Sequence, residues 1–328
     1  MKFSNQMTRY SSFLVIPLLA LGAGILYPNL HAAEMKGGQE SFASSKEAIA
    51  ALQTAVTADD RAALRKIFGP EYEKLLTGDA VQDANNVKRF AAAMNQRCRP
   101  VKDGDDKITL EVGSNDWPMP IPLVAAGGQW HFDTAAGKEE IINRHIGKDE
   151  LHAIGACRAY VTAQRKYADE NPEGNPGTVY ARHFKSSPGK KDGLYWPVTG
   201  NESASPFGPL VAEAQDEGYI VHKKGTGPHS FHGYYFRILT RQGDAAPGGK
   251  MDYINGGRLT GGFALVAYPE IWDQAGVMTF IVNQDGKVYQ QNLGEDTAKL
   301  AAGLKEYNPD SDWKLVEDEG VIRAASER

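Results

Sequence analysis

Residues 231–237 read FHGYYFR and open the part of the chain that decides the fold class. Aromatic and β-branched residues recur after them in short runs that end at turn-forming residues, which is typical of β-strands. The expected strands cover residues 233–240, 263–268, 277–282 and 287–290. Between the last two, residues 283–286 read NQDG, and Asp-Gly is a strong hairpin signal. The pattern predicts an antiparallel sheet, closed by a helix over 297–307.

The segment before this sheet changes from helical to irregular. Residues 136–168 have a helical period and predict two helices, one opening at Lys138 and the other at Asp149. Residues 169–209 are rich in Asn, Pro, Gly and Ser, yet their aromatic side chains need burial, so a packed irregular region is expected. A short helix is expected over 208–217.

The N-terminal half shows helices first and strands afterwards. Helical stripes of apolar residues lie within 44–56, 59–68 and 87–94, and strand patterns lie at 108–112, 119–124 and 129–132. Gly127 and Gly128 form a natural hairpin turn between the last two strands. The sequence therefore predicts an α+β protein. It has N-terminal helices plus a small antiparallel sheet over 34–147, then a module of one long helix packed on an antiparallel sheet over 148–328.

Residues 1–33 have the composition of a secretory signal peptide. Lys2 and Arg9 precede an uncharged apolar run over 13–26, which is shorter than the roughly 20 residues that cross a bilayer. Ala33 suits the position before cleavage, whereas His31 is larger than the residue usual there. Cleavage after residue 33 and retention as an N-terminal anchor both stay open, and the expected location is periplasmic or secreted. No later segment is long and apolar enough to span a membrane.

The net charge of the chain limits the classes of partner that it is expected to bind. Loss of residues 1–33 removes two positive charges and no negative ones, which takes the formal net charge from −5 to −7. This mildly acidic balance argues against general nucleic-acid binding. An envelope protein or a cell-surface polymer is the expected partner. With 41% hydrophobic residues, the chain can bury a substantial core in each half.

The chain has two cysteines, one in each half. In an oxidising compartment Cys98 and Cys157 can form one disulfide. The competing interpretation is that Cys157, on a helical apolar stripe, is a buried free thiol that packs as a small apolar residue.

Four segments carry a resemblance to a known family. They cover residues 117–124, 128–141, 188–197 and 257–269, which include WPMPIPLV and GRLTGGFALVAYP. In these segments the chain resembles the secreted bacterial proteins grouped as domain of unknown function 2950. The resemblance covers almost the whole of residues 34–328 and implies an envelope or secreted location. That family brings no activity to carry over.

A second resemblance concerns residues 149–293. The helix ending AQRKY at 163–167, the GYYF run at 233–236 and the FIVNQDG run at 280–286 are similar to the globular head of type IV pilin-like proteins. This resemblance implies a helix packed on an antiparallel sheet. The chain departs from pilins because a whole α+β domain precedes the head helix, so only the fold is carried over.

A histidine group lies just before the first expected strand of the sheet. His222, His229 and His232 fall within eleven positions, and imidazoles act as metal ligands or general bases. His229 and His232 are the candidate catalytic residues, with Asp192 or Asp252 as the acidic partner. The alternative is a loop whose imidazoles pack on aromatic neighbours or cap backbone groups.

Two further candidate sites follow from side-chain chemistry. Asp169, Asn171 and Glu173 alternate along a turn, an arrangement that can wrap calcium, although the twelfth position of that loop is Tyr180 rather than Glu. A solvated turn is the competing interpretation. Trp117, Tyr195 and Trp196 are the candidates for a ligand-binding surface, against burial in the core.

The lysines around Pro188-Gly189, at 185, 190 and 191, form a small basic loop that can contact anionic envelope components. No serine elbow, Cys-His arrangement or paired carboxylates occur in a convincing context, and no cofactor motif is present. The first hypothesis is therefore a non-enzymatic binding or assembly component of the envelope. The alternative is a hydrolase or other small-molecule enzyme with a histidine site between the two modules.

Overall fold

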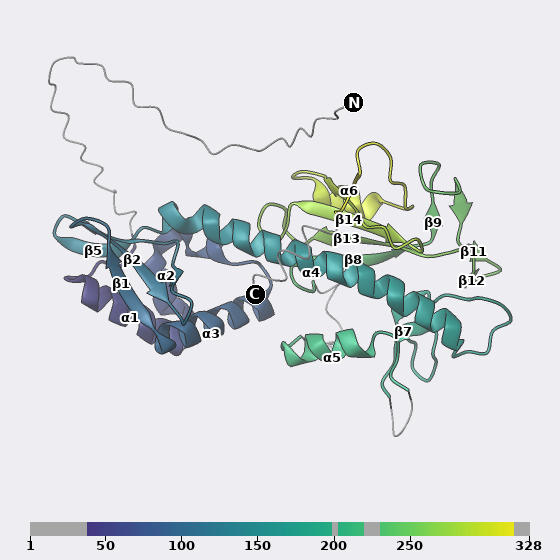
Figure 1. Ribbon diagram of the computed structural model, residues 1–328, viewed down its shortest axis with the longest axis horizontal. Coiled ribbons are helices and arrows are strands. Elements are labelled where there is room, and N and C mark those ends of the chain that lie inside the picture. The colour runs from purple at the N-terminus through teal and green to yellow at the C-terminus, as the bar shows by residue number, and fades with distance from the viewer. Residues whose placement is uncertain (1–37, 199–202, 220–229, 318–328) are drawn as a thin grey trace, which may run out of the picture. The chain divides into compact units, whose positions relative to one another are not determined.

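The computed structural model describes residues 38–198, 203–219 and 230–317 (Figure 1). The expected signal segment lies outside the described residues, which all belong to one compact unit over 35–328. The N-terminal half begins with α1 (Ser45–Thr57), α2 (Arg61–Phe68), the 3-10 helix η1 (Gly69–Leu75) and α3 (Ala80–Gln96). Side chains of Ser44, Asp60 and Asp79 accept hydrogen bonds from first-turn N–H groups of the three α-helices, which explains where these begin.

The N-terminal sheet is entirely antiparallel. It consists of β1 (Cys98–Lys102), β2 (Lys107–Val112), β3 (Trp117–Pro118), β4 (Leu123–Ala126) and β5 (Gln129–Phe132), in the order β1-β2-β4-β5 with β3 beside β2. Gly127 and Gly128 both have positive φ, 60° and 79°, which confirms the hairpin turn between β4 and β5. Alternate residues of β2 are buried and face the helices, forming the N-terminal core.

The segment predicted as two helices is one helix, α4 (Thr134–Glu170) (Figure 1). Asp149 and Glu150, which the sequence pattern predicts to begin a second helix, lie in the interior of α4. Asp149 is buried, and Oε1 of Glu150 accepts hydrogen bonds from the N–H groups of Val277 and Met278, 3.0 Å each. The prediction of a break was wrong because these carboxylates make tertiary contacts rather than a cap. The helix ends at Asn171, whose φ of 43° is left-handed.

The C-terminal sheet follows the predicted strands closely. It consists of β8 (Tyr234–Leu239), β13 (Ala264–Pro269), β14 (Met278–Asn283), β15 (Tyr289–Asn292) and β16 (Lys314–Leu315), in the antiparallel order β16-β15-β14-β13-β8. The helix α6 (Thr297–Gly303) follows β15. Helix α4 packs against β13 and β14, and Tyr160 of α4 donates a hydrogen bond to the carbonyl of Ala264, 3.3 Å. The α+β class is confirmed.

Short elements occupy the irregular region and the strand connections. Their bounds are β6 (His183–Lys185), β7 (Gly193–Tyr195), α5 (Gly208–Asp216), β9 (Arg241–Gln242), β10 (Met251–Asp252), β11 (Ile254–Asn255) and β12 (Arg258–Leu259). Strands β6 and β7 are parallel. Leu194, Trp196 and Phe207 are buried, as expected for a packed region.

Two hydrophobic clusters form the interior. One gathers buried residues between Phe42 and Phe132, and the other between Ala153 and Trp313. The predicted division at 147/148 falls inside α4, whose course is continuous there. The division into two domains stays a prediction.

Both cysteines are free, so the predicted disulfide is absent from this structure. Cys98 opens β1 beside the N-terminal cluster, whereas Cys157 belongs to the C-terminal cluster and is fully buried. Burial raises the pKa of the Cys157 thiol to about 12. Cys157 therefore matches the competing interpretation, a small apolar core residue.

Helix α4 has the length of a membrane span but carries charged residues along its course. Across the described ranges, no helix is both long enough and apolar enough to cross a bilayer.

Candidate functional site

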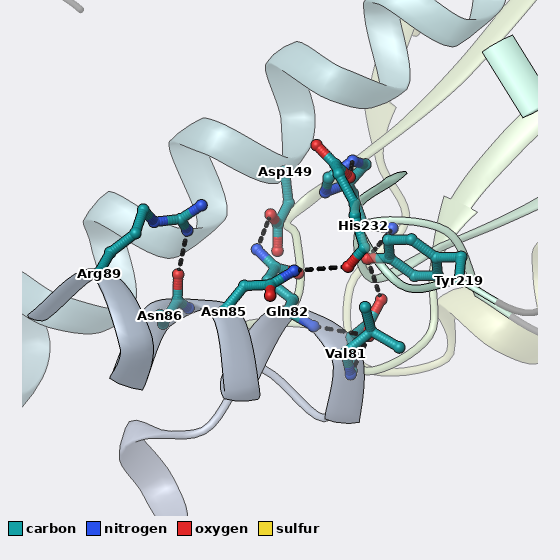
Figure 2. Close-up of polar contacts among 10 residues, drawn as sticks. Val81, Gln82, Asn85, Asn86, Arg89, Asp149, Tyr219 and His232 are labelled. Atoms are coloured by element: carbon teal, nitrogen blue, oxygen red, sulfur yellow. Dashed lines mark hydrogen bonds and ion pairs between the residues drawn. The ribbon is translucent and has the colours of Figure 1, made fainter. Parts of the chain in front are cut away.

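Asp149, His152 and His232 converge on one point. Each offers a ligand atom, and these atoms all lie within 4.8 Å of one another. Asp149 and His152 are three residues apart on α4, which puts them on the same face of the helix. His232 reaches the same face from the loop before β8 (Figure 2). We call this set the His–Asp centre.

The loop before β8 holds His232 in an uncommon conformation. His232 has a φ of 47°, in the left-handed region, and Gly233 follows with a φ of 69°. A Cβ atom on Gly233 would lie 2.9 Å from Cβ of Ala275 and 3.2 Å from Oδ2 of Asp149. Only glycine fits there without a shift, so the backbone can approach Asp149 closely.

The histidine rings are packed tightly. The imidazoles of His152 and His232 stack with centroids 3.8 Å apart and an interplanar angle of 30°. The rings of Phe231 and Tyr219 lie 4.4 and 5.5 Å from that of His232. Aromatic neighbours thus fix the His232 side chain.

Helix α3 supplies a second layer of polar contacts (Figure 2). Nε2 of Gln82 donates a hydrogen bond to Oδ1 of Asp149. The hydroxyl of Tyr219 donates a hydrogen bond to Oδ2 of Asp79, 2.7 Å, and the hydroxyl oxygen of Tyr219 accepts one from the N–H of His232, 3.2 Å. Asn85 donates to the carbonyl of Glu217, 2.8 Å. These bonds connect the His–Asp centre to the N-terminal half of the chain.

Asp149 is the most buried member of the centre, with 0% of its surface exposed. Burial raises the pKa of its carboxyl to about 8, the nearby charges of Asp79 and Asp83 add to the increase, and the Gln82 hydrogen bond opposes it. Among the described residues, Oδ2 of Asp149 has no hydrogen-bond partner. A cation bound there would compensate this desolvated oxygen.

Glu217 stands at the outer edge of the centre. Its Oε2 lies 2.8 Å from Nε2 of His232, and 35% of its side chain is exposed. The two groups are close enough to form an ion pair. Their orientation does not meet the geometry of a hydrogen bond to Oε2. Burial raises the pKa of Glu217, and the neighbouring charge of Glu213 adds to the increase.

The donor set permits two kinds of chemistry. Two imidazoles and a carboxylate are ligands for zinc and other first-row transition metals, whereas calcium prefers oxygen alone. Without a metal, a histidine oriented by a carboxylate can act as a general base.

Of the predicted histidines, the structure places His232 in the centre, and His222 and His229 lie outside the described residues. The predicted acidic partners are elsewhere. Asp192 accepts hydrogen bonds from the N–H and hydroxyl of Ser187, 2.7 and 2.8 Å. Asp252 accepts the N–H of Ile254, 2.8 Å. Both carboxylates stabilise local turns, and their role as an acidic partner of a histidine stays a prediction.

Sequence reasoning missed Asp149 and His152 as site residues. The available signal was their spacing, Asp-x-x-His on a helical pattern, which directs two ligand side chains to one side of a helix. Asp149 was instead interpreted as part of a helix start. Gln82 carried no signal of its own, because its role depends on how α3 meets α4.

The candidate calcium loop is held by its own side chains. Asn171 donates to the carbonyl of Asn175 and accepts its N–H, both 2.8 Å. Oε2 of Glu173 faces the hydroxyl of Tyr167 and the amide of Asn175, 3.4 Å each. Asp169 lies on the last turn of α4. Calcium binding at this turn stays a prediction.

The candidate aromatic surface residues do not form one surface. Trp196 is buried and lies under Nζ of Lys191, 5.5 Å from the ring centroid, and Tyr195 is half-buried on β7. Both belong to the region of the basic loop, where Lys185, Lys190, Lys191 and Trp196 line a groove of about 710 Å³. Trp117 lies in the N-terminal half on β3.

Comparison with known proteins gives one result. Residues 39–316 match the model of a family described as "Protein of unknown function (DUF2950)". No curated protein and no solved structure matches the chain, so the pilin-like comparison stays a prediction.

Proposed function

We propose that this chain, which belongs to the DUF2950 family, is a binding protein that holds a divalent transition-metal ion in its His–Asp centre. The observation that carries the proposal is the convergence of one ligand atom each from Asp149, His152 and His232 within 4.8 Å. Zinc is the reference ion for this donor set, because it accepts imidazole and carboxylate ligands together.

The distances between the three ligand atoms fit a single bound ion after small shifts of the side chains. Ligand atoms lie about 2.0 to 2.2 Å from zinc, which puts them roughly 3.5 Å apart in tetrahedral geometry. Side-chain shifts on the order of 1 Å bring atoms that lie within 4.8 Å to that spacing.

The surrounding contacts match those of metal ligands. A ligating histidine usually turns its other nitrogen to a carboxylate, and a ligating carboxylate is itself hydrogen-bonded. Glu217 faces Nε2 of His232, and Gln82 donates to Asp149. The burial of Asp149 adds to this support, because an isolated carboxylate with an unsatisfied oxygen is costly in the interior and a metal removes that cost.

A non-enzymatic binding role in the periplasm or outside the cell accounts for these features together. Lys2, Arg9 and the apolar run over 13–26 support export of the chain. The metal would tie α4 to the loop before β8, next to the contacts from α3. An envelope protein or a cell-surface polymer is the partner that the acidic surface and the expected location favour.

One observation favours a second candidate, a hydrolase that uses His232 as general base. Glu217 is partly exposed and its Oε2 lies 2.8 Å from Nε2 of His232, close enough for this carboxylate to orient the imidazole once the two groups align. In that case hydrolysis of p-nitrophenyl esters or phosphates would persist in EDTA and be lost in Glu217→Gln. In the metal proposal, Glu217→Gln only weakens metal affinity, by about 10-fold.

The test is metal binding to the purified chain after chelation and dialysis. Titration with zinc chloride, followed by calorimetry and elemental analysis, should give one ion per chain. Asp149→Asn and His152→Ala should lose that ion. His183→Ala should keep it, because His183 is exposed on β6 and lies outside the centre. Circular dichroism checks that the variants fold. Equal zinc content in folded wild type, Asp149→Asn and His152→Ala would contradict the proposal.

A further inference from the structure

A cavity of about 270 Å³ lies in the N-terminal half of the chain. Residues from the three N-terminal α-helices, η1, β3 and α4 line it. Its apolar wall includes Leu64, Phe68, Leu76, Phe90, Trp117 and Ile141. Binding cavities for small molecules are mostly apolar with a few placed polar groups, which is the composition found here.

Two residues that line the cavity each carry a buried polar atom without a hydrogen bond among the described residues. The hydroxyl of Tyr72 is on a side chain that is only 4% exposed, and it has no partner in the described part of the chain. Asn86 on α3 is half-buried, and its Nδ2 also has no partner in that part of the chain. The Oδ1 atom of Asn86 accepts a bond from Arg89, 2.5 Å, which assigns Nδ2 as its available donor. Buried polar groups without partners are costly, so their presence on a cavity wall indicates a ligand.

The other polar groups on the wall already have partners or stay neutral. Oδ1 of Asp83 accepts bonds from the N–H and hydroxyl of Thr77, 2.9 Å each. Arg144 binds Glu140 and lies over the ring of Trp117, 5.2 Å from its centroid. Burial lowers the pKa of His145 to about 4, so its ring is neutral at pH 7. The polar groups that remain without a partner are therefore two uncharged hydrogen-bond donors, the Tyr72 hydroxyl and the Asn86 amide.

The size of the cavity limits the ligand. An apolar cavity of about 150 Å³ accommodates benzene, which has six carbon atoms. By that proportion, 270 Å³ admits roughly ten non-hydrogen atoms. We propose that this cavity binds an aliphatic chain of about eight or nine carbon atoms, whose terminal oxygen accepts a hydrogen bond from Tyr72 or Asn86. Fatty acids and neutral alcohols or esters share this chemistry.

The proposal does not depend on the metal centre. None of Asp149, His152 and His232 lines the cavity. Loss of metal binding in a variant of the centre and loss of ligand binding in a cavity variant are thus separate results.

The test is calorimetric titration of the full chain with 1-octanol and, separately, sodium octanoate. Wild type should bind one equivalent of at least one of them, and the tighter of the two identifies the polar end. Val87→Phe, which fills the cavity from α3, should weaken binding at least 10-fold. Ile49→Phe is the matched control, because Ile49 packs on the same core without lining the cavity.

Tyr72→Phe gives a second readout that a purely structural role would not produce. Because the hydroxyl has no partner among the described residues, its removal should leave the unfolding temperature unchanged or raise it. The same change should weaken binding of the preferred probe about 5- to 10-fold, the effect of one lost hydrogen bond. Absence of saturable binding to wild type, or equal affinity in wild type, Tyr72→Phe and Val87→Phe, would overturn the proposal.

Discussion

His145 and Asp149 lie one helical turn apart on α4, and burial acts on them in opposite directions. It lowers the pKa of the His145 ring to about 4 and raises the pKa of the Asp149 carboxyl to about 8. In each case burial disfavours the charged form, which is the cation for histidine and the anion for aspartate. At neutral pH this stretch of α4 therefore presents an uncharged ring and a mostly uncharged carboxyl, unless a bound cation draws the proton from Asp149.

The shift on His145 predicts a loss of stability in acid. Its pKa is about 4 in the folded protein, against an ordinary value of 6.5, because of burial and then the positive charges of Lys148 and Arg89. The unfolded chain therefore binds a proton first as pH falls. The contribution of His145 to the free energy of unfolding is fully present above pH 6.5 and is lost as pH falls from 6.5 towards 4. The full shift is worth about 3 kcal/mol, and partial exposure of the ring reduces the expected loss to about 2 kcal/mol.

Urea unfolding at pH 7.5 and pH 4.5 measures this loss in wild type and in His145→Gln. The difference between the two proteins isolates His145, because the other titrating groups are common to both. Wild type should lose about 2 kcal/mol more than the variant over this interval. An equal loss in both would show that His145 is protonated as easily in the folded chain as in the unfolded one.

Among the elements, α4 contributes to both cores, and its close packing depends on particular glycines. Gly137 lies where the helix meets the segment before β4, and a Cβ atom there would be 2.5 Å from the carbonyl carbon and oxygen of Pro120. Gly155 lies on the exposed side of the same helix, with nothing within 4 Å of the same added atom. Packing therefore requires glycine at position 137 of the helix but not at position 155.

The same substitution should therefore act with opposite sign at these two positions. Gly137→Ala should destabilise the protein by about 2 kcal/mol, because backbone atoms of Pro120 and Ile121 would have to move. Gly155→Ala should stabilise it by about 0.5 to 1 kcal/mol through helix propensity. Chemical denaturation of both variants beside wild type makes the comparison. A stabilising Gly137→Ala would show that α4 does not approach the Pro120 segment as closely as described.

At the scale of the whole molecule, the His–Asp centre lies where contacts from both halves of the chain meet. Gln82 and Asn85 belong to α3 and Asp79 is its N-cap, whereas Tyr219 and His232 come from beyond α4. A metal at this point binds the folded chain alone, since the ligands converge only after α4 and the loop before β8 have packed. Binding of this kind stabilises the folded state by mass action.

Metal removal should therefore lower the unfolding temperature. At a zinc concentration about 100 times the dissociation constant, the stabilisation is about 2.7 kcal/mol. In a chain of this length it corresponds to a shift of about 5 °C. Differential scanning calorimetry with zinc and then with EDTA measures the shift, and Asp149→Asn should abolish it. In the EDTA-treated protein, dithiothreitol should leave the unfolding temperature unchanged, because Cys98 and Cys157 are free. A shift that survives in Asp149→Asn would place the ion elsewhere.

The sequence by itself determined the family, the α+β class and most of the strands and helices. These depend on local signals, since turn residues and apolar periods act on the backbone of their own segment. The hairpin between β14 and β15 illustrates the point, because Gly286 has a φ of 80° and the N–H of Asp285 bonds to Oδ1 of Asn283, 3.1 Å.

Only the tertiary structure decided the continuity of α4, the free state of the cysteines and the membership of the His–Asp centre. Asp149 looked like a helix start because its chemistry suits a cap, and only packing against α3 and the loop before β8 gave it another role. His152 and His232 are 80 positions apart, and no local pattern encodes their stacking. Convergence of distant side chains is set by the packing of whole elements, which local signals in the sequence do not specify.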